Sequence, residues 1–481
     1  MTARAVMVVG TASHVGKSWM ATAICRHLRR RGLRVAPFKA QNMSLNSYVC
    51  RDGGEIGRAQ VAQAEACGLE PATDMNPVLL KPAAAAGSQV IVNGKVWKQL
   101  SADAYYGEFD FLLQQVLAAY RRLAAEYDFI VLEGAGGTAE INLRDRDLVN
   151  LPLAERLDVP ALLLADIDRG GVFASVTGTL RLISEGERRR VRSFAVNRFR
   201  GDTGLFESGR AMLEERAERP CLGVFPFARD IKLDAEDSVS LEDHDDGEAI
   251  DGELDIVIVR LPHISNFTDF RLLTRARYVD RPTRNTPDIM ILPGSKNTVA
   301  DLHWLRRNGL AEWVIDCHAK GAAVWGICGG YQMLGRLVAD PAGVESALGA
   351  AEGLGLIDSE TILAETKTTR AVTARTAAGD VEFAAYEIHM GETRQARQTS
   401  PFAFVEGRTE GFRNGRVIGT YLHGALEDAD LLRGLVAEVA VRRGKRAPPI
   451  EAAPKSEQYD RLADWFEQNA DMGLFEELYL R

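Results

Sequence analysis

The sequence predicts an α/β protein built from two doubly wound, mostly parallel sheets, one in each half of the chain. Short apolar runs rich in Val, Ile and Leu alternate with longer amphipathic stretches in both halves. This alternation is typical of buried parallel strands connected by helices. The chain has 481 residues, which suits two or three domains. An acidic segment separates the two series, so the sequence predicts two α/β units.

The first unit is expected to open with a buried strand at 5–10. Residues 16–31 follow with helical character and a basic last turn, which complements the helix dipole. Gly32 ends this helix. Further strands are expected at the apolar runs LRVAPF, DFIVLEG, PALLLAD and SFAVNRF. Helices between these strands would cover a parallel sheet on both faces.

A linker is expected at 233–252, where acidic residues are dense and large apolar residues are few. Such a segment cannot bury a core. It would join an ATP-binding unit at 1–232 to a second unit at 253–481. The second unit repeats the alternation with DIVIVRL, DIMILPG, AAVWGIC and RVIGTYLHG. The tail at 428–481 is expected to be helical and to belong to this second unit.

Composition excludes several classes of function. The formal net charge of -9 argues against a nucleic-acid partner, because phosphate binding needs an excess of Lys and Arg. We find neither a signal peptide nor an apolar run that could span a bilayer, so a cytoplasmic protein without a membrane partner is expected. The six cysteines are scattered and form no CxxC pair, which argues against a disulfide framework or structural zinc.

The segment GTASHVGKS at 10–18 is the candidate phosphate-binding loop. Gly16 would let backbone N–H groups approach the phosphates, and the helix that follows presents its positive end. Lys17 is expected to reach the β- and γ-phosphates of ATP, and the Ser18 hydroxyl to hold Mg²⁺. Five residues separate Gly10 from Gly16, one more than in the common loop. The alternative is a chance Gly-Lys-Ser turn at a helix start.

Acidic residues at the ends of later strands are candidate partners for this Mg²⁺, because ligands bind at the carboxyl ends of strands in open α/β sheets. Glu133 ends DFIVLE and precedes a glycine-rich turn, so it is the preferred metal ligand. Asp166 and Asp168 follow PALLLA. Each acid could instead cap a helix or lie in a solvated loop. No tightly bound cofactor is expected beyond Mg²⁺ with ATP.

Cys328 is the candidate nucleophile of the second unit. It stands between an apolar strand and a helix in AAVWGICGGYQMLG, which is a nucleophile elbow with Cys in place of Ser. A helix N-terminus favours the thiolate, and the backbone N–H of Gly329 can stabilise an oxyanion. Gly294 and Ser295, in LPGSKNT, are candidates for the second oxyanion donor. The alternative there is an ordinary strand-to-helix turn.

A catalytic thiolate needs a base, and His423 is the preferred candidate because it ends the strand RVIGTYLH. His389, in YEIHMGE, is the rival, and its flanking acids could make it a structural group. A carboxylate that would orient the base is not evident. Ala425 stands two residues after His423, and Glu427 is the nearest downstream acid.

These motifs resemble two known families. GICGGYQMLG with YLHG resembles the class-I glutamine amidotransferases, in which Cys forms a glutamyl thioester and His is its base. Many members carry Glu at the position of Ala425, and its absence resembles the cobyrinic-acid branch. GTASHVGKS, VLEGAGG and NRFRGD resemble the dethiobiotin-synthetase-like ATP-binding fold. This second resemblance implies that Thr11 and Asn197 take part in ATP binding.

Over nearly its whole length the chain resembles the cobyric acid synthase family. The resemblance is carried by KAQNMSLNSYV, GGEIGRAQ, MNPVLLKP, EINLRDRD, ADIDRGGVFA, PGSKNT and YEIHMGET. It implies that ATP and L-glutamine are used to amidate four carboxylates (b, d, e and g) of adenosylcobyrinic acid a,c-diamide, giving adenosylcobyric acid in cobalamin biosynthesis. Gln41, Asn42 and Asn46 are expected to bind this substrate, unless they are turn residues.

Two alternatives remain open at this point. Another glutamine-dependent carboxylate ligase, such as cobyrinic acid a,c-diamide synthase, would share the two-unit plan. A non-catalytic switch related to partitioning ATPases would carry an inactive amidotransferase-like unit, although the intact Cys328 and His423 argue against it. The sequence leaves the oligomeric state and the route of ammonia open.

Overall fold

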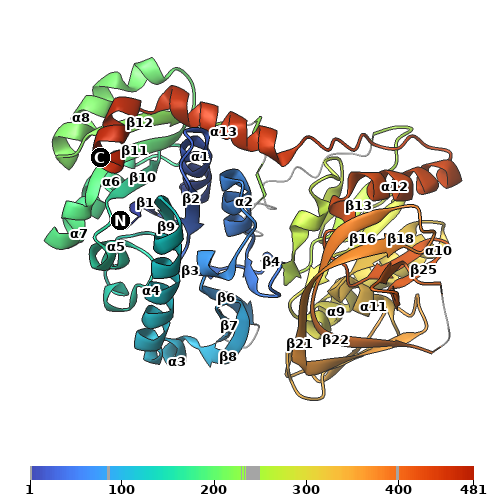
Figure 1. Ribbon diagram of the computed structural model, residues 1–481. Helices are drawn as coiled ribbons and strands as arrows, with labels where there is room; N and C mark the ends of the chain where they lie inside the picture. The colour runs from blue at the N-terminus through green and yellow to red at the C-terminus, as the bar shows by residue number, and fades with distance from the viewer. Residues whose placement is uncertain (1–2, 84–86, 229, 232, 235–249, 397–399) are drawn as a thin grey trace.

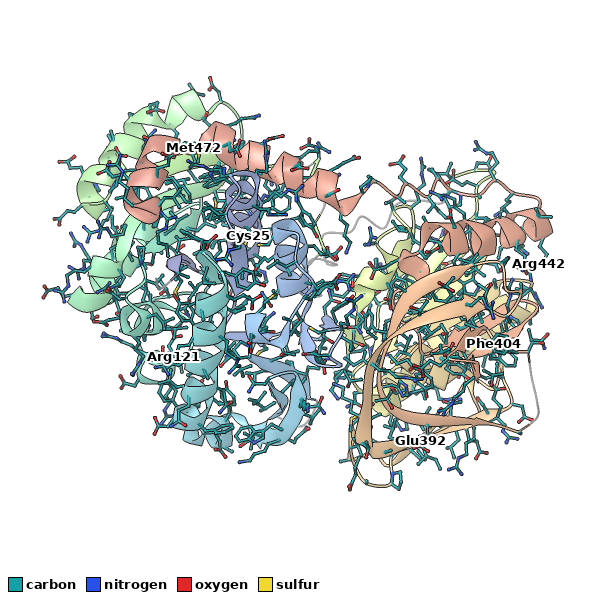
Figure 2. All side chains as sticks on the ribbon, viewed as in Figure 1. Cys25, Arg121, Glu392, Phe404, Arg442 and Met472 are labelled. Carbon is teal, nitrogen blue, oxygen red and sulfur yellow. The ribbon has the colours of Figure 1, made fainter. Side chains whose placement is uncertain are left out.

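The computed structural model describes residues 3–83, 87–228, 230–231, 233–234, 250–396 and 400–481. Figure 1 shows two bodies side by side, with both chain termini on the first. Side chains fill the interior of both bodies, and Cys25 lies deep inside the first, whereas Arg442 lies at the edge of the second (Figure 2). No helix among the described residues combines the length and apolar character needed to cross a membrane.

The first body is built around a six-stranded sheet of order β12-β11-β10-β1-β9-β2, in which all neighbouring strands are parallel. The strands are β1 (Arg4–Gly10), β2 (Val35–Phe38), β9 (Phe129–Glu133), β10 (Ala161–Asp166), β11 (Val191–Phe199) and β12 (Cys221–Pro226). The main covering helices are α1 (Lys17–Arg30), α2 (Arg58–Cys67), α4 (Phe109–Glu126), α5 (Leu151–Leu157), α6 (Val172–Leu182), α7 (Glu185–Arg190) and α8 (Glu207–Ala217). Separate apolar clusters pack on the two faces, as the doubly wound prediction requires.

A smaller sheet projects from the first body towards the second (Figure 1). Its order is β3-β6-β7-β8, formed by β3 (Gln41–Met43), β6 (Val78–Ala83), β7 (Gly87–Val92) and β8 (Lys95–Ser101). The hairpin of β4 (Ser47–Val49) and β5 (Glu55–Gly57) lies beside it and faces the second body. These short strands, which we did not predict, therefore form part of the contact between the two bodies.

The second body has a six-stranded sheet of order β15-β13-β16-β18-β26-β25, parallel except for the edge strand β25. The strands are β13 (Ile256–Val259), β15 (Arg277–Val279), β16 (Ile289–Leu292), β18 (Ala323–Ile327), β25 (Phe412–Asn414) and β26 (Val417–Thr420). The helices are α9 (Thr298–Arg307), α10 (Leu310–Ala319), α11 (Gly329–Leu334) and α12 (Ala429–Arg443). The predicted fold class, two mostly parallel α/β sheets, is confirmed.

A second sheet in this body contains the long antiparallel pair β21 (Ser359–Thr376) and β22 (Glu382–Gln395), which curves along the side facing the first body (Figure 1). We did not predict this pair. Most residues of β21 are exposed or half-buried, and β22 mixes buried and exposed residues, so the pair lacks the continuous apolar runs that identify the buried parallel strands.

The end of the chain corrects one prediction. The tail is helical, but α13 (Lys455–Asn469) packs against α1 of the first body rather than on the second. Trp465 and Phe466 are buried in the apolar cluster of the first body, and Arg26 pairs with Asp460 at 2.8 Å. The amphipathic pattern predicts the helix but does not say which body its apolar face will cover. Most of the predicted linker, 235–249, lies outside the described residues.

Candidate active sites

Cys328 occupies a sharp turn at the carboxyl end of the central strand β18, directly before α11. Its backbone has a positive φ of 51 with ψ -107, which is a strained conformation for a residue with a side chain. Close packing around the flanking glycines holds the backbone in this strained conformation. A Cβ on Gly330 would lie 1.9 Å from the Leu292 carbonyl oxygen, and one on Gly326 would lie 2.6 Å from that of Gly330. The flanking glycines are therefore required by contact with backbone.

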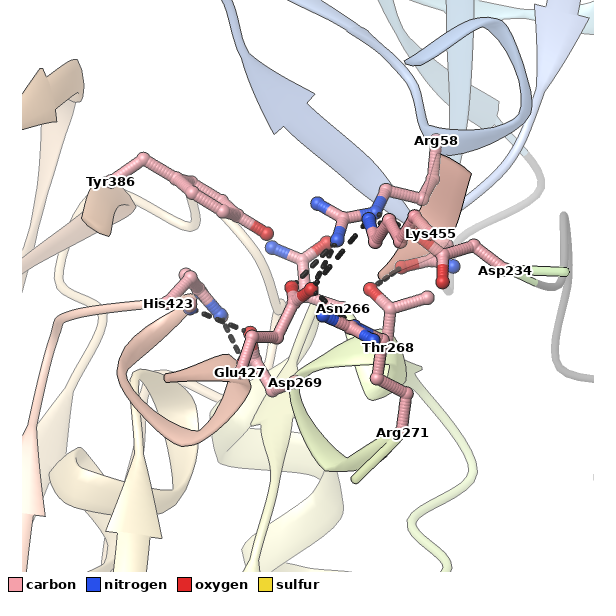
Figure 3. Close-up of polar contacts among 12 residues, drawn as sticks. Arg58, Asp234, Asn266, Thr268, Asp269, Arg271, Tyr386, His423, Glu427 and Lys455 are labelled. Carbon is pink, nitrogen blue, oxygen red and sulfur yellow. Dashed lines mark hydrogen bonds and ion pairs between the residues drawn. The ribbon is translucent and has the colours of Figure 1, made fainter. Parts of the chain in front are cut away.

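His423 lies beside this turn and is fully buried. Its Nδ1 is hydrogen-bonded to the Asp269 carboxylate at 2.7 Å, and the same carboxylate accepts the backbone N–H of Gly424 at 2.9 Å (Figure 3). The other ring nitrogen, Nε2, has no well-oriented hydrogen-bond partner among the described residues. A Cys–His–Asp arrangement results, in which the carboxylate fixes the ring and leaves Nε2 for the sulfur.

The two candidate histidines differ in their pKa values. Burial lowers the pKa of His423, but Asp269 and Cys328 outweigh this effect and raise it to about 10. The protonated imidazole can therefore stabilise a thiolate at neutral pH. Burial lowers the pKa of His389 to about 4, and this ring stacks on Tyr421 at 3.8 Å between centroids. His389 is thus a neutral packed group that lines the cavity of Cys328.

Asp269 was missed by the sequence analysis. It lies in the short 3-10 helix η5 (Phe267–Phe270), 154 residues before His423. No motif spacing connects the two positions, so only the fold reveals the pair. Glu427, the acid closest downstream, turns away from the imidazole and binds Arg58 and Arg271 instead.

The oxyanion candidates meet around Cys328. Gly294–Ser295 form the short strand β17, and a Cβ on Gly329 would lie 2.7 Å from the Ser295 nitrogen. Gly329 is the first residue of α11, so its N–H has no acceptor within the helix. A Cβ on Gly294 would lie 3.3 Å from the His423 ring. The Ser295 hydroxyl donates to Asp301 at 2.6 Å, so an oxyanion role of this strand would rest on its backbone N–H groups and stays a prediction.

The phosphate loop lies at the carboxyl end of β1, on the first body. The Lys17 ammonium donates to the Ala12 carbonyl at 3.0 Å and to the Gly136 carbonyl at 2.7 Å. The Asn197 amide donates to the Val15 carbonyl at 2.8 Å and so supports the loop from β11, two strands away in the sheet. Thr11 is partly exposed and donates its N–H to the Leu164 carbonyl at 2.9 Å.

The candidate metal ligands, Ser18 and Glu133, are also brought together. The Ser18 hydroxyl donates to Glu133 Oε1 at 2.8 Å, and Lys39 pairs with the same oxygen at 2.8 Å. One hydroxyl and one carboxylate fit Mg²⁺ carried by a nucleotide, because phosphate oxygens and water complete its shell. No group of three potential ligands among His, Cys, Asp and Glu occurs in the described part of the chain. Asp166 and Asp168 pair with arginines instead.

The three candidate substrate residues have different surroundings. Gln41 is half-buried and accepts a hydrogen bond from Tyr105. Asn42 is buried and donates to Gln60 at 3.0 Å. Asn46 is buried and accepts from the Thr268 hydroxyl of the second body at 3.3 Å. Asn42 and Asn46 therefore have structural roles in this arrangement, and binding of substrate by these residues stays a prediction.

The two bodies meet in a buried network of charges next to the cysteine site (Figure 3). Arg58 of α2 binds Glu427 at 2.6 Å and Asp234 at 3.1 Å. Arg271 binds the same Glu427 at 2.8 Å, and Lys455 binds Asp234 at 3.0 Å. Because removal of one partner from a buried ion pair is strongly destabilising, this network resists separation of the two bodies.

Comparisons with known proteins match both halves of the chain. Residues 6–241 match the CobQ/CobB/MinD/ParA nucleotide binding domain, and residues 255–431 match the CobB/CobQ-like glutamine amidotransferase domain. Three similar proteins carry the name cobyric acid synthase. That of Limosilactobacillus reuteri (strain DSM 20016) is 45% identical over 99% of both chains. That of Sorangium cellulosum (strain So ce56) is 46% identical over 99% of both chains. That of Salmonella agona (strain SL483) is 45% identical over 98% of this chain and 97% of its own.

These relatives confirm the prediction of a glutamine-dependent amidating ligase and leave no support for a non-catalytic switch. The predicted resemblance extends over both bodies, since the three relatives align with nearly all of this sequence. The chain belongs to the cobyric acid synthase family.

Proposed function

We propose that this enzyme amidates the b, d, e and g carboxylates of adenosylcobyrinic acid a,c-diamide, with one ATP and one glutamine for each amide. The observation that carries the proposal is the pairing of two sites in one chain. A buried Cys–His–Asp arrangement lies in the second body, and a phosphate loop lies in the first. An enzyme that takes nitrogen from glutamine and activates an acid with ATP needs both.

In the glutaminase half-reaction, the Cys328 thiolate attacks the side-chain amide carbon of glutamine. The backbone N–H groups of Gly329 and of the Gly294–Ser295 strand stabilise the tetrahedral oxyanion. The His423 imidazolium gives its proton to the leaving nitrogen, and ammonia departs from a glutamyl thioester. Water, deprotonated by the now neutral imidazole, hydrolyses the thioester to glutamate. Asp269 holds the ring in the orientation that both steps require.

In the ATP half-reaction, a substrate carboxylate oxygen attacks the γ-phosphorus and ADP leaves. Lys17 and the backbone around Gly16 bind the phosphates, while Thr11 and Asn197 shape the loop. Mg²⁺, which Ser18 and Glu133 would hold, supplies charge neutralisation on the phosphate oxygens. Ammonia then attacks the acyl phosphate carbon, and inorganic phosphate is the leaving group. The carboxylate becomes a primary amide.

The decisive experiment supplies the purified chain with the a,c-diamide, ATP, Mg²⁺ and glutamine, and counts amide additions by mass spectrometry of the corrinoid. The proposal predicts four additions, with ADP and glutamate formed in proportion. Cobyrinic acid with free a and c carboxylates is the matched control. Amidation that stops after the a and c positions of the control, without conversion of the a,c-diamide, would overturn the proposal in favour of a,c-diamide synthase chemistry.

A further inference from the structure

The cavity at Cys328 contains two opposite charges that are not paired with each other. Residues of both bodies line it. Besides the cysteine and Gly329, its wall includes Lys81, Lys296, Lys367 and Glu345. We propose that Lys296 and Glu345 bind the α-carboxylate and the α-ammonium group of glutamine, respectively. This inference rests on the proposed glutaminase function and names how its substrate is selected.

Lys296 differs from the other two lysines of the cavity in its lack of an ion-pair partner among the described residues. Its ammonium makes no side-chain hydrogen bond or ion pair within the described ranges, and burial lowers its pKa. The other two lysines of the cavity, Lys81 and Lys367, both bind the carboxylate of Glu55. Lys296 directly follows Ser295, a candidate oxyanion residue, so the backbone that would bind the amide oxygen also places this ammonium.

Glu345 is held in place by its own loop. Asp340 accepts the N–H groups of Val344, Glu345 and Ser346 at 2.7, 2.9 and 2.8 Å. One oxygen of the Glu345 carboxylate accepts the N–H of Thr298 at 3.1 Å, and the other has no hydrogen-bond partner in the described part of the structure. Burial raises the pKa of this carboxyl, and Lys296 opposes the rise.

Lys296 and Glu345 lie close enough to interact but do not form an ion pair. Lys296 and Glu345 influence each other's pKa, yet no ion pair within 4.0 Å joins them among the described residues. Unpaired charges in an enclosed site are costly unless a ligand completes them. An α-amino acid carries both complementary charges on one carbon. A zwitterion whose side-chain amide points to Cys328 would satisfy both groups at once.

This arrangement would also protect the product. The corrinoid substrate and product carry primary amides of their own, which an unselective thiolate could hydrolyse. A site with polar groups that match a particular ligand rejects analogues lacking those groups by large factors, because its own groups are then left unpaired. The two charges would therefore restrict the cysteine to amides borne by an α-amino acid.

The test measures the activity of two variants towards each of three amides. Lys296→Met and Glu345→Gln are assayed for ammonia release from glutamine, from glutaramate, which lacks the α-ammonium, and from 4-aminobutanamide, which lacks the α-carboxylate. We expect each variant to lower kcat/KM for glutamine by about 10²-fold. Lys296→Met should lose its preference for glutamine over 4-aminobutanamide, and Glu345→Gln its preference over glutaramate. Lys320→Met, which removes an exposed partner of Asp316, is the matched control.

The possible outcomes distinguish a failure of the proposed glutaminase function from a failure of the proposed zwitterion site. If the unaltered enzyme releases no ammonia from glutamine, the proposed function fails. If it does, but both variants keep the preferences of the unaltered enzyme, the zwitterion site is wrong. Equal loss towards all three amides would also overturn it, since that result indicates general damage. Glu345→Asp, which keeps the charge, should retain the preference over glutaramate, and thermal unfolding checks that each variant is folded.

Discussion

The phosphate loop and the cysteine turn occupy equivalent places in two similar sheets, yet the first is partly exposed and the second is buried. Each follows the carboxyl end of a central parallel strand and precedes a helix. The phosphate loop is exposed at residues 12–14, and the Lys17 ammonium rests on two backbone carbonyls. The cysteine turn is buried, and a Cβ on Gly326, Gly329 or Gly330 would lie within 2.7 Å of a backbone atom.

The difference fits the chemistry that we propose for each site. Phosphates are bound by many backbone donors and one mobile lysine, so an open loop that adjusts to its ligand is sufficient. Covalent attack depends on one sulfur and one ring nitrogen, and small errors in position are costly. Cys328 is therefore held in a strained conformation by packing, and His423 by a buried carboxylate.

The largest expected effect is at the packed site. Cys328→Ala should lower glutamine-dependent amidation by at least about 10³-fold, because no other group can form the thioester. Amidation supported by high ammonia should continue, since the ATP site is untouched. Initial rates with each nitrogen source provide the measurement. Cys317→Ala, on α10 and away from the cavity, is the control. Glutamine turnover that survives in Cys328→Ala would show that the nucleophile is misassigned.

Lys17→Ala should show the reverse pattern. Loss of the ammonium that stabilises the transferring phosphoryl group should lower amidation about 10²- to 10³-fold with either nitrogen source. Glutamine hydrolysis should be less affected, because the cysteine site is separate. Unchanged ammonia-dependent amidation in this variant would contradict the assignment of the phosphate loop.

Asp269→Asn tests the carboxylate that the sequence did not reveal. We expect a loss of about 10²-fold in glutaminase kcat, with little change in ammonia-dependent amidation. The imidazolium is required, so activity falls as pH rises through the pKa of His423, which is about 10. Asn cannot favour the charged ring, so this basic limb should move to lower pH. A pH–rate profile with an unchanged basic limb would exclude Asp269 as the orienting group.

The smallest effects concern stability and compare the two glycine-rich turns directly. Gly330→Ala should cost about 3 kcal/mol, because its Cβ would lie 1.9 Å from the Leu292 carbonyl oxygen. Gly136→Ala, in the open turn next to Lys17, should cost only about 1 kcal/mol, because φ is +62 but nothing lies within 4 Å. Chemical unfolding of both variants provides the comparison. Equal costs would argue that the two sites are packed alike.

Local patterns explain what the sequence could predict. The strand–turn–helix signals around Lys17 and Cys328 lie within a few residues, and apolar alternation predicts both parallel sheets. Contacts between distant segments could not be predicted. Asp269 lies 154 residues from His423. The apolar face of α13 fits either body in principle, and only packing against α1 decides. Asn42 and Asn46 stand in the same polar sequence whether their side chains bind a ligand or other side chains of the protein, so the sequence could not decide their role.

The proposed reaction requires that nitrogen freed at Cys328 is used at the ATP site of the same molecule. The direct measurement supplies glutamine labelled with ¹⁵N in its side-chain amide together with an excess of unlabelled ammonium, and determines the isotope content of the amidated corrinoid. We expect nearly every added amide to carry ¹⁵N. Amides that match the isotope ratio of the bulk ammonium would contradict it, because they would show that the two centres do not cooperate.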